Sequence, residues 1–170
     1  MHHAATLRRA TPDDWPTYRE LRLRSLELAP DAYGSTLAAE IVQPEEFWRH
    51  RLANSQTLLA EVEGIAAGIG TGIRDPHEIG SREVVGVWVE PGYRRRGIAE
   101  QLIESLALWA QDAAAHALAL WVSDGNDTAR RLYERTGFVA TGERDVVRGT
   151  LMEERMRCPL PPVDAHGGRA

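Results

Sequence analysis

Lysine is absent from the 170-residue sequence, so all 20 residues of the Lys+Arg class are arginines, against 25 Asp+Glu and a formal net charge of -5. This absence excludes several enzyme classes, because a P-loop needs its lysine, a Schiff-base enzyme needs an amine and class A β-lactamase chemistry needs its S-x-x-K. The acidic balance also argues against nucleic acid as the main partner, since nucleic-acid-binding modules are usually basic.

Cysteine and long apolar runs are scarce as well. Cys158 is the one cysteine, so no internal disulfide forms and nothing in the chain requires an oxidising compartment. No apolar run approaches the ~18 residues of a membrane helix, and the first residues lack the apolar centre of a signal peptide. The six histidines show no ligand spacing. We therefore expect a cytoplasmic protein with no membrane partner and no metal.

The remaining sequence alternates apolar strands with amphipathic helices, which predicts an α/β (α+β) protein with helices on both faces of a mixed sheet. We expect one domain over residues 6–158, followed by a mobile tail over residues 159–170, which are rich in Pro and Gly. Strands are predicted at residues 7–10, 57–62, 65–73, 83–89, 117–122, 138–142 and 151–157, and helices at residues 12–28, 44–52, 98–113 and 126–135.

Residues 87–99 carry the most informative functional pattern. A buried strand ends at Val89, three consecutive arginines follow, and a helix begins at Gly97. Backbone N–H groups at a helix start have no internal partners and lie at the positive end of the helix dipole, so they bind phosphate, and Gly97 places no Cβ in the way. The structural alternative is a strand-to-helix turn with a solvated basic patch. A Walker A loop is excluded, because Ile98 stands at the position of its lysine.

Two blocks of this sequence resemble the GNAT superfamily of acyl-CoA-dependent N-acyltransferases. Residues 87–91 and 94–99 match the family's motif A, V-x-V-x-P followed by [RQ]-x-x-G-x-[GA]. Residues 120–138 match the block L-x-V-x-x-x-N-x-x-A-x-x-L-Y-E-x-x-G-F with every spacing kept. Together, and in this order, the blocks are specific, and the resemblance extends over about residues 6–158.

The resemblance implies the GNAT fold, with a mostly antiparallel central sheet of about seven strands, and an N-acetyltransferase that moves an acetyl group from acetyl-CoA to a primary amine by direct attack in a ternary complex. It implies that backbone groups of one strand bind the pantetheine arm, that loop amides and arginine side chains bind the phosphates, and that Tyr133 donates a proton to the departing CoA thiolate. The implied cofactor-binding residues are Val87, Val89, Arg94, Arg95, Arg96, Gly97, Ile98, Ala99 and Asn126.

Tyr133 and Asn126, the two site residues in the second block, could each also have a purely structural role. Tyr133 lies on a buried helix face, where a tyrosine is otherwise a core aromatic. Asn126 is well placed to cap the helix that follows it, and this function is compatible with a contact to the pantetheine arm or to a water molecule.

Glu83 is the candidate general base. In one branch of the family a glutamate lies four residues before the first pantetheine-binding position, which here is Glu83, and strand alternation places it on the same face as Val85, Val87 and Val89. The alternative is an exposed charge at a strand end. Asp124 is the second candidate base, and a water chain without a single base is the third.

The amine acceptor is not identified by the sequence, although an acidic protein weakly favours a cationic amine. The rival functions are a catalytically silent CoA-sensing module of the same fold and, with little support, a dinucleotide-binding oxidoreductase that lacks its G-x-G-x-x-G unit. Because many relatives are dimers, a homodimer stays open. Aromatic candidates for the acceptor pocket, most of them expected to be core residues, are Trp15, Tyr18, Tyr33, Trp48 and Trp88.

Overall fold

The computed structural model describes residues 4–162, which form one seven-stranded sheet with the strand order β1-β2-β3-β4-β5-β7-β6. Neighbouring strands are antiparallel, except β4 and β5, which are parallel. The predicted mixed, mostly antiparallel sheet with helices on both faces is confirmed. No helix within residues 4–162 is long and apolar enough to cross a membrane.

The helices and strands follow the predicted order closely. The first half contains β1 (Thr6–Arg9), α1 (Trp15–Leu28), α2 (Leu37–Ile41), α3 (Glu45–Ala53), β2 (Gln56–Val62), β3 (Ile65–Arg74) and β4 (Arg82–Val89). The second half contains α4 (Ile98–Asp112), β5 (Ala117–Ser123), α5 (Asp127–Arg135), β6 (Val139–Arg148) and β7 (Leu151–Pro159). Short 3-10 turns at Pro12–Asp14, Pro30–Ala32 and Pro91–Tyr93 join some of them.

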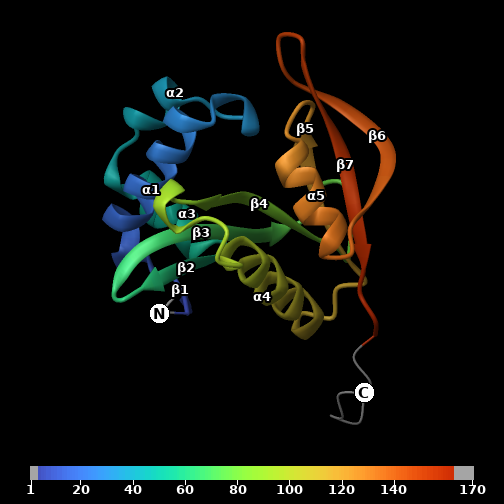
Figure 1. The fold of residues 1–170 in the computed structure, drawn as a ribbon, viewed down its shortest axis with the longest axis horizontal. Coiled ribbons are helices and arrows are strands. Elements are labelled where there is room, and N and C mark those ends of the chain that lie inside the picture. The colour runs from blue at the N-terminus through green and yellow to red at the C-terminus, as the bar shows by residue number, and fades with distance from the viewer. Residues whose placement is uncertain (1–3, 163–170) are drawn as a thin grey trace.

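Helices cover the sheet on both faces (Figure 1). One face, which we call the α4 face, is covered by α4 and α5, and its core includes Leu102 and Leu106 of α4. The other, the α1 face, is covered by α1 and α3, and Trp48 of α3 is fully buried there. Apolar residues spaced at helical intervals on α4 account for its docking, since they form one continuous stripe.

Small residues on β3 let α4 approach the sheet. A Cβ added at Gly72 would lie 2.4 Å from Cζ3 of Trp109, and one at Gly70 would lie 3.4 Å from Cβ of Leu102. The glycine-rich stretch of β3 is therefore a packing feature and not a phosphate-binding loop.

β4 and β5 separate soon after they pair, and this separation creates the site. Their register contains two pairs, Arg82 with Leu118 and Glu83 with Ala119. Beyond them β5 continues beside β7, whereas β4 continues beside β3 alone, so the outer edge of β4 is left without a strand partner. A strand edge of this kind presents unpaired N–H and C=O groups.

A β-bulge at Gly86 corrects one expectation about β4. Gly86 has φ +66°, and the register with β3 shifts between Ile69 and Thr71. As a result Val84 and Val89 both lie in the core of the α4 face, although they are five positions apart and simple alternation would place them on opposite faces. Glu83, which points opposite to Val84, is therefore on the α1 face and does not share a face with Val89, contrary to the prediction from simple alternation.

Other differences concern element bounds. The short helix α2 is not among the predicted helices, and β6 extends to Arg148, beyond the predicted end at residue 142. β7 extends to Pro159, and Leu160 is buried, with its N–H donating to the carbonyl of His116 (3.0 Å). The domain boundary predicted at residue 158 thus falls inside β7, while residues 163–170 of the predicted tail lie outside the described residues.

Candidate active site

A cavity of about 240 Å³ lies where β4 and β5 separate. Its walls come from both faces of the sheet: Tyr133 belongs to α5 on the α4 face, whereas Trp121 points to the α1 face, because its neighbours Leu120 and Val122 are buried under α4. The cavity therefore passes through the sheet. Its lining residues are Ala32, Tyr33, Gly34, Glu83, Val84, Val85, Gly86, Val87, Trp121, Asn126, Ala129, Tyr133 and Glu153.

The free edge of β4 borders this cavity. Since the Glu90 N–H donates to the Ala67 carbonyl on β3 (2.9 Å), alternate backbone groups at Val89 and Val87 point to the opposite edge. The Val87 carbonyl accepts a hydrogen bond from the Tyr33 hydroxyl (3.0 Å), and the Val89 carbonyl accepts one from Arg94 Nε (2.9 Å). Both predicted pantetheine-binding positions thus lie at an edge where an extended chain can add as a strand.

The loop between β4 and α4 has the geometry of an anion site. Arg95 has φ +61° and Gly97, the N-cap of α4, has φ +75°, both in the left-handed region. Left-handed residues alternating with ordinary ones turn successive N–H groups to one side, and the first N–H groups of α4 have no partner within the helix. This loop has the backbone geometry that a diphosphate site needs, and the binding of phosphate by Gly97, Arg95 and Arg96 stays a prediction.

The three arginines are not equivalent. The Arg94 guanidinium lies 4.6 Å from the centroid of the Trp88 ring and bonds the Val89 carbonyl, so it braces the end of β4. Arg96 lies over Tyr93 (5.3 Å) and donates to the Gly92 carbonyl (3.2 Å). All three predicted phosphate-binding arginines are exposed, but the guanidinium of Arg94 is directed to the strand end.

The two residues predicted from α5 both reach the cavity. Asn126 caps the helix, its Oδ1 accepting from the Ala129 N–H (3.3 Å), so the capping alternative is confirmed while its side chain also lines the cavity. Tyr133 packs against Phe138, with ring centroids 6.1 Å apart. Burial, and then the neighbouring Tyr33, raise the pKa of the Tyr133 hydroxyl above its usual value, which keeps it protonated and able to donate.

Glu83 reaches the same cavity from β4. It is 7% exposed, and within residues 4–162 its Oε2 has no hydrogen-bond partner. Burial, and then the nearby Asp75, raise the pKa of Glu83 to about 7, although His77 and Arg155 act in the opposite direction. A buried carboxyl with a pKa near neutrality is suited to accept a proton from an amine.

Asp124, the second candidate base, is placed differently. It is exposed and forms an ion pair with Arg144 of β6, and it is not among the residues that line the cavity. Of the two candidate bases, Glu83 alone therefore lies within the cavity as lined by the described residues.

The aromatic candidates for the acceptor pocket differ in whether they line the cavity. Tyr33 lines the cavity, whereas Tyr18, Trp48 and Trp88 are buried in the core of the α1 face, as most were expected to be. The lining residues that were not predicted include Trp121 and Glu153. The alternation of the Leu120-x-Val122 motif already turns Trp121 away from the core, but the position of Glu153 depends on the pairing of β5 with β7, which no local pattern reveals.

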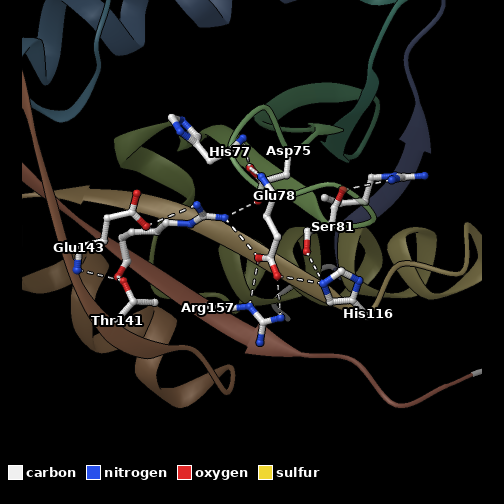
Figure 2. Close-up of polar contacts among 10 residues, drawn as sticks. Asp75, His77, Glu78, Ser81, His116, Thr141, Glu143 and Arg157 are labelled. Carbon is white, nitrogen blue, oxygen red and sulfur yellow. Dashed lines mark hydrogen bonds and ion pairs between the residues drawn. The ribbon is translucent and has the colours of Figure 1, made fainter.

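A cluster of paired charges lies beside the cavity on the α1 face (Figure 2). Arg155, 5% exposed, donates through Nη2 to Asp75 Oδ2 (2.5 Å), and Glu143 and Glu78 approach the same guanidinium at 3.5 Å. Figure 2 shows the Glu78 carboxylate held between Arg157 and His116, at 3.0 Å and 2.9 Å respectively. We call these residues the Arg155 cluster.

The chain belongs to the acetyltransferase (GNAT) family, because the model of that family matches residues 10–138. The family uses acetyl-CoA, which supports the identification of the protein as an acyltransferase. Groups of three or more side chains able to hold a metal ion are absent from the described part of the chain. Among curated protein sequences, none matches this chain.

Solved structures share the fold at low sequence identity. An acetyltransferase of the GNAT family from Streptococcus pneumoniae is 23% identical, with a TM-score of 0.75 and coverage of 92% of this chain and 99% of that chain. The yncA structure from Salmonella typhimurium, which contains its cofactor acetyl-CoA, is 20% identical, with a TM-score of 0.75 and 98% of each chain covered. The ribosomal-protein-alanine N-acetyltransferase from Brucella melitensis is 24% identical, with a TM-score of 0.75 and coverage of 91% and 99%.

Proposed function

We propose that this protein is an N-acetyltransferase that moves an acetyl group from acetyl-CoA to a primary amine by direct attack within a ternary complex. The observation that carries the proposal is the cavity through the sheet, which brings a buried, unpartnered carboxyl, Glu83, together with a protonated hydroxyl, Tyr133, beside the free edge of β4. One group accepts a proton and the other donates one, as amide formation from a thioester requires.

The binding of acetyl-CoA is assigned to the residues between β4 and α4. Backbone groups of Val87 and Val89 at the free strand edge hold the pantetheine arm, and Asn126 faces the same cavity. The amides of Arg95, Gly97, Ile98 and Ala99 hold the pyrophosphate at the start of α4, with Arg95 and Arg96 near the remaining phosphate charge. Arg94 acts on the phosphates less directly, because it is bonded to Val89.

The chemistry of the step follows from the two ionisable groups. When bound, acetyl-CoA supplies the acetyl group as a thioester. An aliphatic amine arrives protonated, since its pKa resembles that of lysine at about 10.4, and Glu83 accepts the proton that must leave before attack. The C–N bond forms as the C–S bond breaks, and Tyr133 donates its hydroxyl proton to the sulfur. The acylated nitrogen then loses a second proton, which restores the Tyr133 hydroxyl. The net result is an amide, a thiol and one proton, which Glu83 releases to solvent.

Release of free thiol from acetyl-CoA, measured across a panel of amines at about pH 8, tests this function. The Tyr133→Phe variant should lower kcat by about 10²–10⁴-fold while its affinity for acetyl-CoA, measured by titration calorimetry, stays within about twofold of the wild type. The loss in kcat arises because phenylalanine keeps the ring that packs on Phe138 and removes only the proton donor.

The matched control is Tyr18→Phe, since Tyr18 is a buried tyrosine in the core of the α1 face, away from the cavity. This variant should retain wild-type turnover. Equal turnover by Tyr133→Phe and the wild type would contradict the assignment of the acid. A protein that binds acetyl-CoA but releases no thiol with any amine would instead be the silent CoA-sensing module.

A further inference from the structure

Glu153 of β7 lines the same cavity as Glu83, and it too lacks a cationic partner. Neither a hydrogen bond nor an ion pair to its carboxylate is present within residues 4–162. The adjacent Glu154 points to the other face of the sheet and pairs with Arg130 at 2.7 Å. The chain has 20 arginines, and many of them are paired with acids. Two carboxyls that face one cavity without such a partner therefore favour the binding of a cationic ligand.

A neighbouring acid makes the unpaired carboxylate of Glu153 still less favourable without a cation. Asp145 of β6 lies directly opposite Glu153 in the register of β6 and β7, and like charges in such cross-strand pairs repel. Burial, and then Asp145, raise the pKa of Glu153 above its usual value, while His77 lowers it.

We propose that the amine acceptor is a small aliphatic diamine, whose reacting nitrogen lies at Glu83 and whose second, protonated nitrogen binds the carboxylate of Glu153. This proposal rests on the acetyltransferase function proposed above. The two acids lie on different strands of the splayed sheet, β4 and β7, so a short flexible chain with a nitrogen at each end can contact both.

The charges explain why a diamine is preferred over other amines. Glu83 becomes neutral when it accepts the proton of the reacting nitrogen, whereas Glu153 keeps its negative charge beside the second nitrogen throughout the step. An acceptor with a carboxylate at its far end would add a third acid next to Glu153 and Asp145 and would be repelled. An acceptor with an uncharged end would leave the Glu153 carboxylate unpaired.

Three acceptors of similar length test the proposal, because they differ chiefly in the charge at the far end: butane-1,4-diamine, butylamine and 4-aminobutanoate. Thiol release is measured for each at about pH 8, where the second nitrogen is protonated. We expect kcat/KM for the diamine to exceed that for butylamine by about tenfold, the size of effect that one partly buried charge pair gives, and 4-aminobutanoate to be the poorest acceptor.

The Glu153→Gln variant should lower kcat/KM for the diamine by about tenfold and change that for butylamine by less than about twofold. Glu154→Gln is the matched control, because it removes the same charge from the next residue of β7, outside the cavity, and it should leave the preference for the diamine intact. Equal use of the three acceptors by the wild type, or an equal loss for diamine and butylamine in Glu153→Gln, would overturn the proposal.

Binding measurements separate this proposal from the proposed function. Butane-1,4-diamine is titrated into wild type, Glu153→Gln and Glu154→Gln, each saturated with CoA, and the heat is recorded. If no amine is acetylated but the diamine binds and only Glu153→Gln weakens it by about tenfold, the acetyl transfer fails and the diamine site stands. If amines are acetylated and the diamine shows no advantage in binding or turnover, acetyl transfer stands and the diamine site is refuted.

Discussion

Two sets of acidic side chains lie close together on the α1 face of the sheet, and they differ in whether arginines pair with them. In the Arg155 cluster, Asp75 and Glu78 are bonded to arginines. At the cavity, Glu83 and Glu153 have no arginine partner within residues 4–162. Hydrogen bonds from Arg157 and then from His116 lower the pKa of Glu78 to about 2, whereas burial raises that of Glu83 to about 7.

We propose that the paired acids of the Arg155 cluster stabilise the fold and that the unpaired acids at the cavity take part in function. A carboxylate bonded to a guanidinium stays ionised and contributes little chemistry near neutral pH. A buried carboxyl without such a partner destabilises the fold when it ionises, but it exchanges its proton near neutral pH and attracts a cationic ligand. The Arg155 cluster also borders the cavity, since Arg155 lies 6.0 Å from the Trp121 ring centroid, so the two sets influence each other.

The largest effect that this comparison predicts is on turnover. Glu83→Gln removes the proton acceptor and should reduce kcat by about 10²–10⁴-fold. Because Glu83 must be ionised to accept a proton, kcat/KM of the wild type should rise with pH through about 7, and the variant should lose this rise. The measurement is the pH dependence of thiol release for both proteins.

Glu78→Gln is the control for the pH profile, because Glu78 is a paired carboxylate on the same face whose pKa of about 2 lies far below the range measured. Its profile should keep the rise through about pH 7. If Glu78→Gln lost the rise and Glu83→Gln kept it, the distinction between the two sets of acids would be wrong.

The next effect is on stability and concerns the Arg155 cluster. Arg155→Met leaves Asp75, whose side chain is 0% exposed, without its cationic partner. Removing one partner of a buried ion pair typically costs about 3–5 kcal/mol, and we expect this loss in the free energy of unfolding measured with urea. Since Arg155 also lowers the pKa of Glu83, any folded Arg155→Met protein should show its rise in kcat/KM at higher pH.

Arg157→Met is the matched substitution two residues further along β7. Arg157 is bonded to Glu78 near solvent, and its side chain is 33% exposed, so the loss in the free energy of unfolding should be at most about 1 kcal/mol. Similar losses in the two variants would show that burial does not distinguish them.

The sequence predicted the parts of the site whose signals are local. The strand that ends at Val89, the helix start at Gly97 and the spacing of Asn126 and Tyr133 along α5 are all set by residues close together in the chain. Glu83 was predicted from the resemblance to one branch of the family, in which a glutamate lies four residues before the first pantetheine-binding position, and it lines the cavity. The role of each of these residues in catalysis or binding stays a prediction.

The remaining features depend on contacts between distant segments. The bulge at Gly86 moved Glu83 to the face opposite Val89; an isolated glycine within a strand pattern was the signal for it. Glu153 reaches the cavity only because β7 pairs with β5 in the register that places Arg155 opposite Trp121. The sequence does not specify that register locally, so the contrast between paired and unpaired acids appears only in the folded structure.

A smaller effect on stability follows from Glu83. Its folded pKa is raised from 4.5 to about 7, so the folded protein holds the proton more tightly, and stability falls as pH rises between these values. At 1.36 kcal/mol per pKa unit, reduced by solvent screening, the cost above pH 7 is about 2 kcal/mol. Glu83→Gln should therefore unfold at higher urea than the wild type at about pH 8 and close to the wild type at about pH 4. If Glu83→Gln were less stable than the wild type at both pH values, the conclusion that the Glu83 carboxyl has no stabilising partner would be wrong.

The smallest effect compares neighbours on β7. Glu153 is only partly buried, so replacing it with Gln should raise the free energy of unfolding by a few tenths of a kcal/mol near pH 8, because the repulsion from Asp145 is removed and solvent screens the rest. Glu154→Gln breaks the pair with Arg130 and should lower it by a similar amount. The two substitutions should therefore change the free energy of unfolding, measured with urea, in opposite directions. A change in the same direction would show that Glu153 and Glu154 do not differ in their effect on stability.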